Sequence, residues 1–194
     1  VSRLIARFLS TPELGEAIKT ALVKATDPTT LTVGLAALSS IDADLARDVL
    51  LANLDHKEAR IRTLAIRGLA QDKAVNLYDV LEKMLADPES SVRVEALRSL
   101  RNASDKHVPR ERLIEYFEPS LLSKDKATRA AAIAAIAPSF TRDNGETALG
   151  VLKKMQDQYG VAGAEPLMRA VFRTVPEEKA AALLEAHGYV TRWH

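Results

Sequence analysis

The sequence predicts an all-α fold without β-strands. Apolar residues recur at helical spacing from end to end, and no segment alternates apolar and polar residues for several positions between glycine turns. Aspartates, prolines and glycines separate the helical segments at short, regular intervals. Hydrophobic residues make up 47% of the 194 residues and aromatic residues only 5%. This composition favours helices rich in alanine and leucine that pack closely on one another.

Each helix is expected to begin at a residue that caps its first turn. Aspartate and threonine side chains accept the free N–H groups there, and a proline directly after the cap costs little. Thr11-Pro12, Asp27-Pro28 and Asp42 fit this pattern, and so do later turns that contain an aspartate. These are Asp55, Asp72, Asp87-Pro88, Ser104-Asp105, Asp125 and Asp143. The expected helices are 2–10, 13–25, 29–39, 43–54, 57–71, 74–86, 89–102, 110–122, 126–137, 144–158, 164–174 and 177–187.

An arginine motif recurs in three of these helices. The segments are IRTLAIRGL (61–69), VRVEALRSL (92–100) and TRAAAIAAI (128–136). Their arginines, at positions 62, 93 and 129, are 31 and 36 residues apart, which corresponds to one helical hairpin per period. Three residues after each arginine stands an alanine, namely Ala65, Ala96 or Ala132. Small residues on the packed stripe allow neighbouring helices to approach closely.

The segment DPESSVRVEALRSL (87–100) resembles the HEAT repeat, whose second helix opens with Asp, a few variable residues and Val-Arg-x-x-Ala. Segments 55–69 and 125–136 resemble it more loosely, 13–39 lacks the arginine, and 144–174 fits poorly. The resemblance implies a right-handed α–α superhelix of about five helical hairpins, with the second helices on the concave side. It implies a single domain, 1–194, whose clearest repeats are about 43–71, 74–102 and 110–137. Helices 1–10 and 177–187 are the expected end caps.

The repeated arginines are predicted to hold the stack together. A guanidinium group offers several donors in a fixed plane, which suits carboxylates and turn carbonyls. We therefore expect Arg62, Arg93 and Arg129 to bind the opening aspartates or the turn carbonyls of adjacent units.

No catalytic or metal-binding pattern stands out. The chain has no cysteine, and its histidines (His56, His107, His187 and His194) do not have the spacing of paired metal ligands. Nucleophile elbows and phosphate-binding glycine loops are missing from the sequence, and Glu177 and Glu178 follow Pro176 at a helix start, where they complement the helix dipole. We expect no enzymatic activity, no cofactor and no metal.

No window of 18 residues is apolar enough to cross a membrane. The lack of cysteine does not decide the compartment, because a reducing cytosol and a periplasm both accept such a chain. The cytoplasm is slightly favoured, and a processed periplasmic or extracellular chain stays open.

The leading hypothesis for function is a scaffold that binds a protein or peptide on its concave face. The binding residues expected there are Arg67, Arg98 and Arg101, with Arg60 and Arg110 nearby and with Glu95 and Asp105 partly offsetting their charge. Nucleic-acid binding by the same basic residues, as in HEAT-like DNA glycosylases, is the main alternative, although the formal net charge is only +1. A relative of the bilin lyases and a helical appendage of a larger enzyme are further alternatives.

Overall fold

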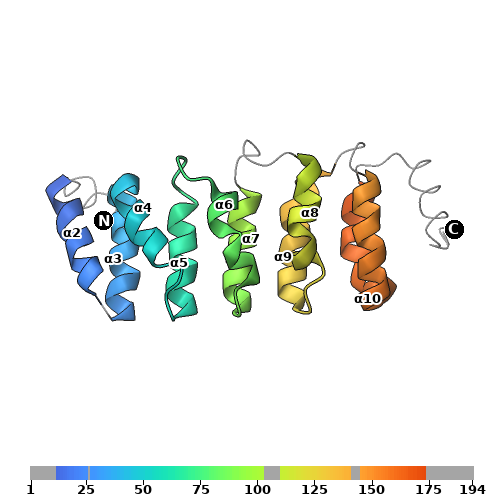
Figure 1. Cartoon of the computed structure of the whole chain (residues 1–194), viewed down its shortest axis with the longest axis horizontal. Coiled ribbons are helices and arrows are strands. Elements are labelled where there is room, and N and C mark those ends of the chain that lie inside the picture. The colour runs from blue at the N-terminus through green and yellow to red at the C-terminus, as the bar shows by residue number, and fades with distance from the viewer. Residues whose placement is uncertain (1–11, 26, 103–109, 141–144, 174–194) are drawn as a thin grey trace. The chain divides into compact units, whose positions relative to one another are not determined.

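The computed structural model describes residues 12–25, 27–102, 110–140 and 145–173 (Figure 1). Every regular element within these ranges is a helix, which confirms the predicted all-α class. None of the helices described is both long and apolar enough to span a membrane. The chain divides into two compact units, 1–103 and 104–194, and each is described by itself. The single repeat domain 1–194 stays a prediction, and the expected capping helices 1–10 and 177–187 lie outside the described residues.

The first unit is built from short helices joined by tight turns. They are α2 (Pro12–Lys24), α3 (Pro28–Ile41), α4 (Ala43–Ala52), α5 (Ala59–Leu69), α6 (Leu77–Leu81), the 3-10 helix η1 (Lys83–Ala86) and α7 (Ser90–Arg101). Helix α5 packs against α3 on one side and α7 on the other, so that α3, α5 and α7 form one row (Figure 1). Helices α2 and α4 pack against each other and on α3, and η1 packs on α7.

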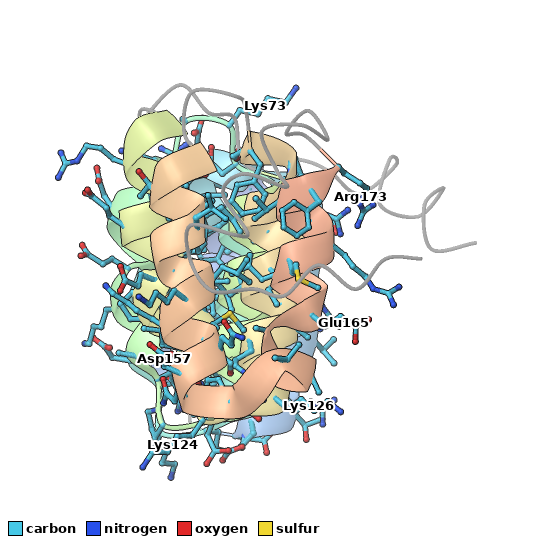
Figure 2. The ribbon with its side chains drawn as sticks, turned by 90° about the vertical axis from the view of Figure 1, so that its right-hand side faces the viewer. Lys73, Lys124, Lys126, Asp157, Glu165 and Arg173 are labelled. Carbon is cyan, nitrogen blue, oxygen red and sulfur yellow. The ribbon has the colours of Figure 1, made fainter. Side chains whose placement is uncertain are left out.

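The second unit contains α8 (Arg110–Leu121), α9 (Lys126–Ile136), η2 (Ala137–Ser139) and α10 (Gly145–Phe172). Helix α10 is interrupted at Gly160, where φ is 72° and ψ is 176°, a conformation that glycine adopts without strain. Figure 2 shows the segment that carries Asp157 beside the segment that carries Glu165. The break therefore lies between the two helices expected at 144–158 and 164–174.

Several predicted N-caps form as expected. The Asp27 carboxylate accepts the Thr30 N–H at 2.8 Å, Asp42 accepts the N–H of Asp44 and Leu45, and Asp125 accepts the N–H of Ala127 and Thr128. Helices α5 and α7 begin differently, because Glu58 and Glu89 stand at their N-cap positions and make no side-chain cap. The aspartates expected to cap them are engaged elsewhere: Asp55 forms an ion pair with Lys83, and Asp87 with Arg62.

The expected helix 74–86 is a short α-helix followed by a 3-10 helix. Asp72 explains the late start, because it accepts the Ala74 N–H at 2.9 Å and its main-chain oxygen accepts the Val75 N–H. This turn holds residues 72–75 outside the helix, and Asn76 then caps α6 by accepting the Tyr78 N–H.

Small residues lie where neighbouring helices of the row touch. Ala65 and Ala96, on α5 and α7, are fully buried, and Ala132 is equally buried on α9. At Gly68 a Cβ atom would come within 2.8 Å of both Leu50 methyl groups and 3.0 Å from the Ser39 hydroxyl, so an alanine there would require the Leu50 side chain to shift.

The arginine motif repeats one geometry three times. The Arg62 Nη1 donates to the carbonyls of residues 56 and 57, at 2.7 and 3.1 Å. Arg93 binds the carbonyls of residues 87 and 88 in the same way, and Arg129 those of residues 123 and 124. In every case the carbonyls stand six and five residues before the arginine. The bond to turn carbonyls is thus confirmed, although each arginine binds the turn of its own helix pair.

Two arginines reach a carboxylate in the turn that comes after the next helical segment of the chain. Arg62 Nε and Nη2 donate to both oxygens of Asp87 at 2.7 Å, and both side chains are almost fully buried. Arg47, on α4, makes the corresponding bond to Asp72, again 25 residues further along the chain. Each aspartate also accepts the N–H two residues ahead, from Ala74 or Glu89. The ion pairs tie α4 to the turn after α5, and α5 to the turn before α7. The pair between Arg62 and Asp87 is a contact of the predicted ladder, whereas Arg47 was not expected to take part.

Substitution of Ala96 by glutamate should destabilise the protein by several kcal/mol, because Ala96 has no exposed surface and a carboxylate there would be buried without a partner. Thermal unfolding followed by circular dichroism measures the loss. The control Arg98→Ala removes an exposed side chain on the same helix and should change stability by about 0.5 kcal/mol or less. Equal melting temperatures for the two variants would contradict the packing of α7.

Acid should weaken the Arg47–Asp72 pair in a defined pH range. The hydrogen bond from Arg47, followed by the bond from the Ala74 N–H, holds the pKa of Asp72 below its ordinary value of 3.8, against the opposing effect of burial. Stabilisation from this carboxylate is therefore complete above about pH 4 and disappears as the pH falls through the lowered pKa. Urea unfolding should show that Asp72→Asn is less stable than the wild type at neutral pH and approaches it at about pH 2. A stability difference that stays constant over this range would contradict the assignment. The exposed control Asp157→Asn should cost no more than about 0.5 kcal/mol at neutral pH.

Candidate functional site: the α3–α5–α7 face

The arginines predicted to bind a partner lie on two adjacent helices. Arg67 is on the last turn of α5, and Arg98 and Arg101 are on the last turn of α7. All three side chains are exposed, and α5 packs directly against α7. We call the solvent side of this row of helices the α3–α5–α7 face.

Arg67 is held by a neighbouring carboxylate. Its Nε and Nη2 atoms each lie 2.9 Å from an oxygen of Glu95, and this hydrogen-bonded pair raises the pKa of the guanidinium above its ordinary value. The Arg67 side chain remains 59% exposed, whereas that of Glu95 is 12% exposed. Arg98 and Arg101 form no ion pair within the described part of the chain. Glu95 was predicted to offset part of the positive charge of these arginines, and its ion pair is with Arg67.

A groove of about 410 Å³ runs beside Arg67. Helices α3, α5 and α7 all contribute to it, and its lining residues are Thr32, Arg60, Thr63, Leu64, Arg67 and Ser91. The hydroxyls of Thr32 and Thr63 donate to the carbonyls of Pro28 and Ala59, so their oxygens face the groove as acceptors only. Arg60 is exposed and has no ion pair among the residues described. The groove therefore combines two guanidinium groups, polar oxygens and one leucine.

The basic character of this face is local. A shift of 31 residues aligns α5 with α7, which places Arg67 with Arg98 and Leu64 with Glu95. The same shift applied to α3 gives Ala36 and the 65% exposed Val33 at these positions. Within the first unit, the arginines of this face thus occupy two of its three helices.

Of the four histidines considered from the sequence, His56 lies within the described residues. His56 Nδ1 accepts the Glu58 N–H at 3.1 Å, which is a structural bond of the turn. His107, His187, His194, Asp105, Glu177 and Glu178 lie outside the described residues, as does the side chain of Arg110. Within the ranges described, no three His, Cys, Asp or Glu side chains gather as metal ligands would.

Comparisons with known proteins show a likeness of fold. No protein-family model matches the chain, and no curated protein matches it. One similar solved structure is the crystal structure of an engineered protein, which is 19% identical. The match covers 98% of this chain and 91% of that one, with a TM-score of 0.52. At this identity the likeness supports the helical fold alone.

Proposed function

We propose that this chain is a HEAT-type repeat protein that acts as an interaction scaffold and binds an acidic, extended segment of a partner protein on the α3–α5–α7 face. The groove between Arg60 and Arg67 is the observation that carries this proposal. In a right-handed stack of helix pairs, this face is the concave one. The repeat assignment is supported by the arginines at 62, 93 and 129, which bind carbonyls at the same spacing in each motif.

The mixture of charge and apolar surface favours a peptide. Exposed arginines attract carboxylates and bind them through paired hydrogen bonds. Leu64 lies in the groove, and Val33, on the adjacent helix, is 65% exposed, so apolar side chains of a ligand could be buried beside its acidic groups. A duplex would instead call for cations spaced along its backbone. Within the first unit, the exposed arginines of this face lie on α5 and α7, and Ala36 holds the position of α3 that is equivalent to Arg67 and Arg98.

Binding of a model ligand tests the proposal. The probe is a labelled peptide of alternating glutamate and leucine, measured by fluorescence anisotropy against a DNA duplex of equal charge. Arg98→Glu combined with Arg101→Glu should weaken peptide binding by about tenfold, because two attractions become repulsions at exposed positions. Lys24→Glu combined with Lys73→Glu changes the net charge equally outside this face and should weaken it by less than about twofold.

A substitution that should strengthen peptide binding provides a second test. Glu95→Gln keeps the shape of the side chain and releases Arg67 from its ion pair, so peptide affinity should rise by about twofold to fivefold. Affinity for the peptide should also fall gently with salt. Equal losses for the arginine and lysine variants would contradict a specific face. Tighter binding of the duplex, with a steep dependence on salt, would replace the peptide by a nucleic acid.

A further inference from the structure

A second hollow lies in the first unit, outside the α3–α5–α7 face. It has a volume of about 440 Å³ and is bounded by α2, α3, α4 and the turn before α5. No residue lines both this cleft and the groove beside Arg67. Its apolar floor consists of Leu22, Leu31 and Val49, and Lys19, His56 and Lys57 stand at its rim.

The cleft occupies the place of a missing arginine. Leu31 stands 31 residues before Arg62, at the equivalent position of α3. Arg62 binds the carbonyl six residues before it and a side chain 25 residues after it, which is Asp87. The residues at the same distances from Leu31 are Ala25 and His56, and both line the cleft. Leucine is shorter than arginine and donates no hydrogen bond, so the space that a guanidinium would fill stays open.

His56 confirms this register. Its Nδ1 accepts the N–H of residue 58, just as the Asp87 carboxylate accepts the N–H of residue 89. In the sequence Asp55 aligns with Asp87, but the hydrogen bonds show that His56 holds this position. A histidine thus replaces the carboxylate where a leucine replaces the arginine, and the charged pair is absent at this junction.

Two hydrogen-bond donors at the rim of the cleft, on His56 and Lys57, have no carboxylate partner among the described residues. Because Nδ1 of His56 is an acceptor, the neutral ring carries its proton on Nε2, which can donate. Lys57 is exposed and forms no ion pair with any described residue. Asp48 is the one carboxylate among the described lining residues, and it already lies 3.7 Å from the Lys19 ammonium. Apolar walls below and unmatched donors above fit a ligand that joins an aliphatic group to an anion.

We propose that this cleft binds the C-terminal residue of a partner peptide. The aliphatic side chain packs on Leu22, Leu31 and Val49, and the terminal carboxylate accepts hydrogen bonds from His56 Nε2 and Lys57 Nζ. This site does not depend on the arginines of the α3–α5–α7 face.

The full chain should be titrated with an N-acetylated pentapeptide that ends in Val-Leu, observed by NMR. The free acid should bind at least about tenfold more tightly than the C-terminal amide, because the amide removes the anion. Lys57→Gln should weaken binding of the acid by about threefold or more, whereas the exposed control Lys73→Gln should leave it unchanged. The Arg98→Glu and Arg101→Glu double variant should also bind normally, which separates this site from the proposed function.

Rebuilding the missing pair gives a second test. Leu31→Arg combined with His56→Asp should fill the cleft with a guanidinium and a carboxylate, as at Arg62 and Asp87, and should abolish peptide binding while helical content is retained. A folded double variant that still binds the peptide would overturn the proposal. Equal binding of acid and amide, or no binding of either, would do so as well. Binding of octanoate without binding of the peptide would assign the cleft to a fatty acid instead.

Discussion

The buried guanidinium of Arg62 is the interaction on which the architecture of the first unit depends. It binds two carbonyls of the turn before its own helix and both oxygens of Asp87 in the turn before α7. Arg62 and Asp87 are only 8% and 7% exposed, so both charges have lost most of their hydration. Removal of either side chain would leave the other as a buried charge without a partner. One side chain thereby fixes the entry to α5 and the spacing to the following helix pair.

This arrangement separates residues that hold the fold from residues available to a ligand. Arg62 points into the junction between helix pairs, whereas Arg67, five positions later on the same helix, points to solvent. At Arg62 the space is filled by the ion pair with Asp87. Where Leu31 replaces it, an apolar cleft with a basic rim remains. The same repeat position thus stabilises one junction and leaves a candidate binding site at another.

Sequence reasoning succeeded where the signal was local. Helical spacing predicted the fold class, and the caps at Asp27, Asp42 and Asp125 follow from side chains that bond within three residues. It failed for Asp72 and Asp87, which look like caps in sequence but bind an arginine 25 residues earlier. The cleft could not be predicted from the sequence either. The absence of an arginine at Leu31 is visible there, but the space that results depends on how three helices pack.

A double-mutant cycle on Arg62 and Asp87 tests the central interaction most directly. The free energy of unfolding in urea should be compared for the wild type, Arg62→Met, Asp87→Asn and the double variant. Each single change leaves a buried polar or charged group without its partner and should cost about 3 kcal/mol or more. The double variant should cost little more than the worse single one, which corresponds to a coupling energy of at least about 2 kcal/mol. Single losses that add within about 0.5 kcal/mol would contradict the account, because the two side chains would then stabilise the fold independently.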